Sequence, residues 1–273
     1  MNTHPFDLAL QLTPLESGVY GGTTSEAYWN MVGPFGGVTA ATALNAVLQH
    51  PALLGEPVSL TVNYAGALLA GAFRIQATAQ RTNRSTQHWT IEMTQANASG
   101  VQEVMLTATA LTAARRPTWG SEDTAMPSVA RPTGLTEAKP MAGVEWVHRY
   151  DMRFVEGPFP REWDGRGDSS LSQLWMRDMP PRVLDFCSLS AMADIFYPRV
   201  YLRRALRVPA GTVSMTVYFH ADGAQLRQAG TGYLLGQARA QAFRNGFFDQ
   251  TSQLWSEAGL LLATTSQIVY YKE

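Results

Sequence analysis

The feature that most constrains this chain is an internal repeat, because one arrangement of elements occurs twice. In the first half, an alanine-rich helix predicted for residues 36–50 precedes four predicted β-strands, at about 58–66, 71–82, 86–95 and 102–112. In the second half, a helix predicted for residues 184–196, stopped by Pro198, precedes strands at about 212–220, 230–242, 247–256 and 260–271. The sequence therefore predicts two copies of one unit.

Short stretches of similar sequence support the duplication. The segment Val58–Val62 (VSLTV) resembles Val213–Val217 (VSMTV), with an offset of 213 − 58 = 155 residues. The segment Gln76–Gln80 resembles Gln237–Gln241, with an offset of 237 − 76 = 161. Two matches in the same order and at nearly the same offset favour a true repeat.

Between the two halves lies a proline-rich stretch with few large apolar residues. Its composition is typical of a linker. We therefore predict a first unit at 1–115, a linker at 116–143 and a second unit at 144–273. One unit alone would leave a sheet edge and a sheet face unmatched, so the two should join into one continuous sheet. A long helix wrapped by an antiparallel sheet, repeated once, is the α+β arrangement of the double hotdog fold.

Composition excludes several classes of function. The formal net charge is −1, so no overall field would attract nucleic acid or an anionic membrane. Apolar runs are short and the N-terminus does not resemble a signal peptide, which predicts a soluble protein with no membrane partner. Cys187 is the only cysteine and the five histidines are scattered, so we expect a cytoplasmic protein without a metal site or other cofactor. Motifs for serine hydrolysis, nucleotide binding and zinc catalysis are absent from the sequence.

Asp194 is the most conspicuous polar residue. At helical spacing it shares a stripe with Leu184, Cys187 and Ala191, so an apolar side chain would be expected there and the carboxylate should be partly buried. It also lies near a helix C-terminus, where the helix dipole disfavours negative charge. Either Asp194 is functional, or it forms a salt bridge with Arg199, Arg203 or Arg204, or the helix end is frayed and solvated.

Three blocks of the second half resemble acyl-CoA thioesterase II and its relatives. They are Leu189–Phe196 (LSAMADIF), Gly211–His220 (GTVSMTVYFH) and Leu262–Gln267 (LATTSQ), and Asn30–Gly37 (NMVGPFGG) resembles the start of that family's first helix. In the family, an Asp, a Thr and a Gln at these places hold the hydrolytic water. The resemblance thus implies that Asp194, Thr212 and Gln267 are catalytic. Ser214 and Met215 replace an acid and a histidine of the family's threonine block, which affects the expected substrate range.

Each of these residues also has a structural interpretation. Gln267 shares strand parity with apolar residues, where its amide needs partners, and a structural glutamine would fit as well. Thr212 has the parity of Ser214 and Thr216, which predicts a solvent-facing threonine. Gly36 and Gly37 could bring backbone N–H groups close to a substrate phosphate or thioester oxygen, although a tight turn is the simpler interpretation.

The first half is predicted to lack an equivalent site. The offset of 155 pairs Thr212 with Pro57, and aligning Leu106–Thr109 with Leu262–Thr265 pairs Gln267 with Leu111. The first helix contains no acid, and Asn45 is its nearest polar counterpart. We therefore expect one active centre, built on the second unit and completed by surfaces of the first.

The resemblance implies hydrolysis of fatty-acyl-CoA to a free acid and CoA. Asp194 would accept the proton of a water fixed by Thr212 and Gln267, although direct attack by Asp194 is an alternative. Two other functions are compatible with the sequence, a hotdog enoyl-CoA hydratase or dehydratase and a non-catalytic acyl-CoA-binding protein. By resemblance, acyl-CoA is the expected partner, and a homodimer or higher homo-oligomer is the expected assembly.

Overall fold

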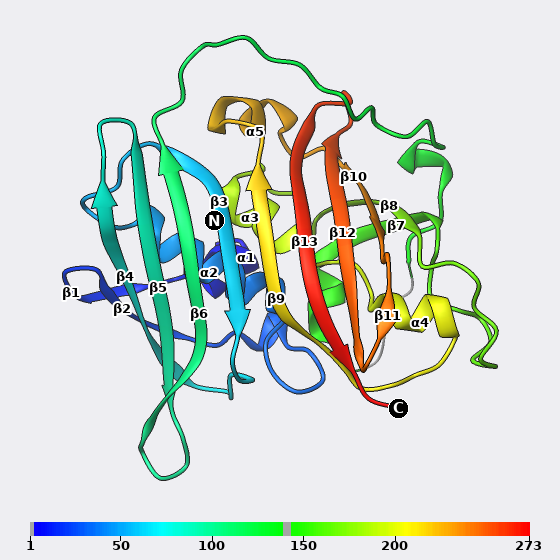
Figure 1. The fold of residues 1–273 in the computed structure, drawn as a ribbon, viewed down its shortest axis with the longest axis horizontal. Helices are drawn as coiled ribbons and strands as arrows, with labels where there is room; N and C mark the ends of the chain where they lie inside the picture. The colour runs from blue at the N-terminus through cyan, green and yellow to red at the C-terminus, as the bar shows by residue number, and fades with distance from the viewer. Residues whose placement is uncertain (1–2, 139–142) are drawn as a thin grey trace.

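The computed structural model describes residues 3–138 and 143–273 and forms an α+β fold built around one large sheet (Figure 1). The first unit contains α1 (Pro5–Ala9), β1 (Thr13–Glu16), β2 (Val19–Thr23), the 3-10 helix η1 (Glu26–Tyr28), α2 (Gly36–Leu48), β3 (Glu56–Tyr64), β4 (Ala72–Thr82), β5 (Thr86–Ala96) and β6 (Gln102–Ala113). The predicted first helix and its four strands are therefore confirmed.

The second unit repeats this plan with more irregularity. It contains η3 (Glu145–Arg149), β7 (Tyr150–Glu156), β8 (Ser172–Asp178), α3 (Phe186–Met192), α4 (Arg199–Arg204), β9 (Ala210–Phe219), α5 (Gly223–Ala229), β10 (Leu234–Arg239), β11 (Phe243–Arg244), β12 (Phe247–Ser256) and β13 (Leu261–Tyr271). Two predicted elements are longer than those in the structure. The helix predicted for 184–196 ends at Met192, and the strand predicted for 230–242 covers only Leu234–Arg239, since α5 occupies the preceding residues.

Strand order confirms the duplication. The sheet runs β1-β2-β4-β5-β6-β3 and continues β9-β13-β12-β10-β8-β7. The second unit therefore has the order of the first, reversed across the junction. Residues of β3 and β9 pair antiparallel at that junction, where the Thr61 and Thr216 hydroxyls lie 3.0 Å apart. One continuous sheet satisfies both inner edges, so the double hotdog prediction is confirmed.

The two central helices lie on one face of the sheet, behind the strands in Figure 1. α2 is rich in alanine because it is enclosed on several sides, by the sheet and by α3. Ala40, Ala43 and Leu44 have no exposed surface. Such small side chains let helices and sheet approach closely. This packing brings the N-terminus of α2 against the C-terminal end of α3.

Among the described residues between β6 and η3, the regular structure is the 3-10 helix η2 (Pro132–Gly134). Along this path Met126, Val129 and Leu135 pack on the outer side of the sheet, against a cluster that includes Trp175 and Trp255. Trp175 Nε1 also donates to the carbonyl of Ala130, at 2.8 Å. Residues 139–142 of the predicted linker lie outside the described residues. The unit boundaries at 115 and 144 remain a prediction.

Candidate active site

Asp194 lies in a turn just after α3 and faces the start of α2. The α-helical hydrogen-bond pattern ends here, because the Asp194 N–H donates to the carbonyl of Ala191, three residues earlier, at 3.2 Å. Across the helix interface, the Gly37 N–H donates to the Asp194 carboxylate. The positive end of α2 thus compensates for the unfavourable C-terminal end of α3.

The arginine alternatives are wrong, because all three arginines bind other groups. The Arg199 guanidinium is fully buried and donates to Ser172 Oγ, at 2.7 Å, and to backbone carbonyls. Arg203 donates to the carbonyl of Gly167, and Arg204 pairs with Glu273. Within residues 3–138 and 143–273, no arginine forms an ion pair with Asp194.

Burial raises the pKa of Asp194 to about 7. Hydrogen bonds from the Gln267 amide and the Gly37 N–H favour the carboxylate and lower the pKa in part, but desolvation is the larger effect. A carboxyl group with a pKa near neutrality can both accept and return a proton under ordinary conditions. This environment is therefore suited to general acid–base chemistry.

Gln267 supplies the link between the last strand and the acid. Its side chain is 3% exposed, and Nε2 donates to Asp194 Oδ1 at 2.9 Å and to Met215 Sδ at 3.2 Å. Both amide hydrogens are thereby used within the protein. The carbonyl oxygen Oε1 is left to accept a hydrogen bond from a water molecule.

Thr212 does not follow the simple strand parity that the sequence predicted. In β9, Ser214 pairs with Ile268 but Thr212 pairs with Val269, so Val213 is an extra residue in a β-bulge. Directly paired residues point to the same face of a sheet, and Val269 is buried on the inner face. The bulge therefore turns Thr212 inward, diagonally across from Gln267, and the expected solvent-facing orientation is wrong.

Gly36 and Gly37 are needed for close approach and not for a turn. Neither has a positive φ, and they form the first two residues of α2. A Cβ added to Gly36 would lie 2.6 Å from Asp194 Oδ2, and one added to Gly37 would lie 2.4 Å from the carbonyl oxygen of Ala191. Any side chain there would push the acid away from α2, so the tight-turn interpretation is wrong.

Tyr64, at the end of β3, is a neighbour of the acid that the sequence patterns did not indicate. Its hydroxyl donates to the carbonyl of Gly36, at 2.9 Å. Its pKa is raised well above the ordinary value by burial and by the charge of Asp194. Strand periodicity predicts the face of such a residue but not which helix end lies above it. With Gly36 and Gly37, Tyr64 makes the first unit part of this site.

The first unit has a comparable bulge but no counterpart of the polar trio Asp194, Thr212 and Gln267. Val58 is the extra residue in β3, because Pro57 pairs with Thr112 and Ser59 pairs with Leu111. The two bulges are again 213 − 58 = 155 residues apart. Pro57 thus remains the counterpart of Thr212.

Strand register corrects the other half of this comparison. Gln267 pairs with Met215, and the equivalent pair in the first unit is Ala110 with Leu60. The counterpart of Gln267 is therefore Ala110, not Leu111, because strand register places Leu106 opposite Tyr64 as it places Ala263, and not Leu262, opposite Phe219. Asn45 is also not part of a second site, since its amide donates to the carbonyl of Leu10 at 2.8 Å.

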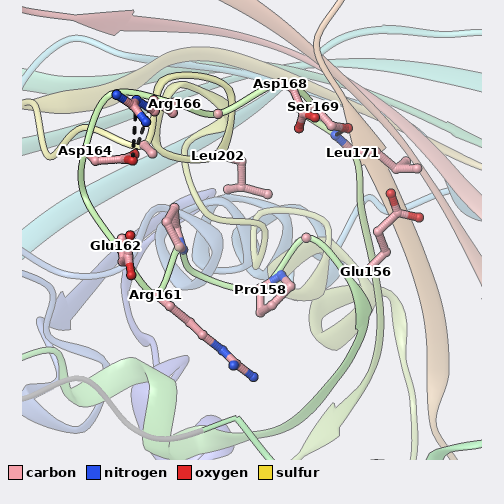
Figure 2. Close-up of a pocket in the computed structure, with 14 residues that line it drawn as sticks. Glu156, Pro158, Arg161, Glu162, Asp164, Arg166, Asp168, Ser169, Leu171 and Leu202 are labelled. Atoms are coloured by element: carbon pink, nitrogen blue, oxygen red, sulfur yellow. Dashed lines mark hydrogen bonds and ion pairs between the residues drawn. The ribbon is translucent and has the colours of Figure 1, made fainter.

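A wide pocket of about 520 Å³ lies elsewhere in the second unit, under the loop 157–171 (Figure 2). Its rim carries charges of both signs, such as Arg161 and Glu162, and Leu202 of α4 contributes to its wall. None of Asp194, Thr212 and Gln267 lines it. We therefore place the candidate chemistry at the α2–α3 interface and not in this pocket.

Residues 3–138 and 143–273 contain neither a metal-binding cluster nor a membrane-spanning helix. In this part of the chain, no cluster of three or more His, Cys, Asp or Glu side chains could hold a metal ion. Within the same ranges, every helix is too short or too polar to span a membrane.

Comparison with solved structures shows the same fold over the whole chain. A conserved hot dog fold protein of unknown function from Alicyclobacillus acidocaldarius is 43% identical, with a TM-score of 0.93 and coverage of 100% of this chain and 99% of that one. An acyl-CoA thioesterase II from Mycobacterium marinum is 18% identical, with a TM-score of 0.77 and 98% of each chain covered. The dehydratase domain of RzxB from Pseudomonas fluorescens is more distant, at 13% identity and a TM-score of 0.57, with 99% of this chain and 100% of that one covered.

Comparison with curated proteins gives no match. Family models match both halves. The acyl-CoA thioesterase N-terminal domain matches residues 25–113, and the acyl-CoA thioesterase C-terminal domain matches residues 122–271. These two matches, in the same order as the two structural units, show that the chain belongs to the acyl-CoA thioesterase family.

Proposed function

We propose that this protein hydrolyses acyl-CoA thioesters with a water molecule activated by Asp194. The observation that carries the proposal is the hydrogen bond between Gln267 Nε2 and Asp194 Oδ1, which joins two of the three predicted catalytic residues at the N-terminus of α2. Thr212 lies on the same inner face of the sheet. The family to which the chain belongs supplies the substrate class.

In this mechanism the water attacks the thioester carbonyl carbon as Asp194 takes one of its protons. Gln267 Oε1 and the Thr212 hydroxyl hold the water in place. The tetrahedral intermediate then breaks down by cleavage of its C–S bond. The departing CoA thiolate takes up the proton that Asp194 received from the water. The products are the free acid and CoA.

The developing oxyanion would be stabilised by the first turn of α2. The first N–H groups of a helix have no intrahelical acceptor, and the earliest paired group here is that of Thr39, at 3.2 Å from the Phe35 carbonyl oxygen. Gly37 donates to Asp194. The N–H groups of Gly36 and Val38 are therefore the donors that we assign to the oxyanion.

A hydratase or dehydratase reaction is less well supported. The histidine closest in sequence within the second unit, His220, is exposed and bonds to Thr264 Oγ1 at 2.9 Å. Within the described ranges, no histidine forms a hydrogen bond with Asp194. An Asp–His pair is therefore not formed at this site.

The test is release of CoA thiol from a panel of acyl-CoAs, comparing the wild type with Asp194→Asn. Loss of the base should lower the rate by roughly 10²- to 10⁴-fold. The matched control is Asp178→Asn, which also neutralises a buried acid with a raised pKa, of about 6, and should keep its activity.

Near-normal turnover by folded Asp194→Asn would contradict the assignment of the base. Tight acyl-CoA binding by the wild type without turnover would instead identify a non-catalytic binding protein. Consumption of an enoyl-CoA without release of thiol would identify a hydratase.

A further inference from the structure

A narrow crevice runs beside the first two turns of α2, on the side of the first unit. Val38, Thr39 and Thr42 of α2 form one wall, and Phe73 of β4 and Met93 of β5 form the opposite wall. The free space inside is about 20 Å³. A group the size of a water molecule needs about 10–15 Å³ of such space, so the crevice has room for only one or two such groups.

The walls of the crevice are suited to an alkyl group. The two threonines of α2 do not offer free hydroxyl hydrogens, because Thr39 donates to the Phe35 carbonyl at 3.2 Å and Thr42 donates to the Val38 carbonyl at 2.9 Å. The opposite wall is a phenyl ring and a thioether. Thr23, Thr24 and Ser25 also line the crevice, but between the two walls a polar ligand would lose its hydration without finding partners, whereas a hydrocarbon would not.

One lining residue of the crevice, Thr39, lies within one helical turn of the candidate active site. Gly36, which touches Asp194, is three residues before Thr39 on the same helix. At about 100° per residue, these two positions lie about 60° apart around the helix axis, within one turn. A thioester carbonyl held at the first turn of α2 could therefore direct its alkyl group around the helix into the crevice.

The loops above the crevice present apolar side chains to solvent. Met31, Val32 and Leu69 are 63%, 74% and 56% exposed. The loop that carries Met31 and Val32 lies against the loop that carries Leu69, since a Cβ added to Gly33 would be 2.7 Å from the carbonyl oxygen of Leu68. Leu68 itself lines the crevice. These exposed side chains thus form an apolar rim beside it.

We propose that this crevice binds the acyl group of the substrate and limits the enzyme to short chains, of about four carbons or fewer. The inference rests on the proposed function. It adds a substrate class, short-chain aliphatic acyl-CoA, and names Met93 as the residue that sets the depth of the binding site. A longer chain would have to displace Met93 or Phe73 from close packing.

The experiment measures kcat/KM for acetyl-, propionyl-, butyryl-, hexanoyl- and octanoyl-CoA. The wild type should have its highest kcat/KM among the three short substrates, acetyl-, propionyl- and butyryl-CoA. The value for octanoyl-CoA should be at least tenfold lower, since one poorly fitting methylene changes kcat/KM by about 10-fold or more. Met93→Ala should raise the value for hexanoyl-CoA at least about tenfold relative to acetyl-CoA, because the shorter side chain enlarges the crevice.

Met152→Ala is the matched control, because Met152 is also buried, at 3% exposure against 1% for Met93, but lies on β7 of the second unit. It should keep the wild-type chain-length profile. Thermal unfolding of both variants separates a change in specificity from a loss of fold.

The outcomes distinguish the two proposals. No hydrolysis of any acyl-CoA by the wild type overturns the proposed function. Hydrolysis that is fastest with octanoyl-CoA overturns the crevice proposal while leaving the thioesterase proposal intact, and this result needs no variant. A folded Met93→Ala with the wild-type profile also overturns the role of Met93.

Discussion

At the scale of single residues, the site depends on one carboxylate held in an environment that partly disfavours its charge. Burial raises the pKa of Asp194 to about 7. Two neutral donors, the Gln267 amide and the Gly37 N–H, stabilise the carboxylate and prevent the pKa from rising further. No cation is paired with it in the described part of the chain. A salt bridge would lower the pKa and weaken Asp194 as a base, so neutral donors suit this chemistry better.

This environment predicts the pH dependence of the reaction. A general base works only when deprotonated, so kcat/KM should rise about tenfold per pH unit below pH 6, bend near pH 7 and level off above about pH 8. The check is a profile of CoA release between pH 5 and 9, with Asp178→Asn as the control that keeps the same inflection. A profile that is flat across this range would contradict the role of Asp194.

At the scale of elements, the β-bulge in β9 and the start of α2 position the side chains of the candidate site. The bulge at Val213 moves Thr212 from the outer to the inner face, and the two glycines let α2 reach the acid. Both features occur where a regular element is interrupted or begins. Regular periodicity is least informative at such places.

The bulge leads to a paired prediction on two threonines of the same strand. Thr212→Val keeps the shape and removes the hydroxyl that we assign to the water, so kcat should fall on the order of 10²-fold. Thr216→Val removes a hydroxyl on the outer face, which forms a hydrogen bond with Thr61 across the unit junction, and should change kcat by less than about twofold. Equal effects of the two substitutions on CoA release would argue against an inward Thr212.

The start of α2 leads to a second prediction. The methyl group of Gly36→Ala would meet Asp194 Oδ2 at 2.6 Å, so the carboxylate must shift by several tenths of an ångström or more. A displacement of about 1 Å can cost about 10²-fold in rate, and we expect a fall of that order in kcat. Gly21→Ala in β2 is the control, because its methyl group would meet only ordinary contacts, at 3.5 Å or more. A steady-state comparison that finds Gly36→Ala as active as Gly21→Ala would refute the close-approach argument.

At the scale of the whole molecule, the site belongs to neither unit alone. Gly36, Gly37 and Tyr64 come from the first unit, and the proposed catalytic residues Asp194, Thr212 and Gln267 come from the second. The β3–β9 pairing and the α2–α3 contact hold these parts together, and the buried cluster that forms the core spans both units. The nearly symmetric scaffold therefore carries a single candidate centre, since Pro57 and Ala110 stand in the first unit where Thr212 and Gln267 stand in the second.

The shared core predicts that the two units unfold together. Cys187, the only thiol, is 5% exposed on α3, so its reactivity reports opening of the core between the units. In urea, the loss of far-UV circular dichroism and the gain of Cys187 labelling should have the same midpoint. Full labelling of Cys187 while half of the β-sheet signal remains would show instead that the units unfold separately.

The sequence by itself determined the duplicated architecture. Periods of 2 and 3.6 residues, turn residues and two matched segments were enough to place α2 and most of the long strands, because local patterns record which face of each element is buried. It also identified Asp194, since a carboxylate on an apolar stripe is visible without any tertiary information. The short strands β1, β2, β7 and β8 were missed because they lack such clear alternation.

Only the tertiary structure decided how the site is assembled. The inward turn of Thr212, the counterpart of Gln267 and the contact between Gly36 and Asp194 all depend on strand register or on helix packing across the two units. Register shifts by one residue at a bulge without a signal in the local pattern, and each such shift exchanges the faces of the strand. Contacts between residues far apart in the sequence are set by how the whole core packs, which is why Gly36 and Tyr64 of the first unit could be brought to Asp194 only by the fold.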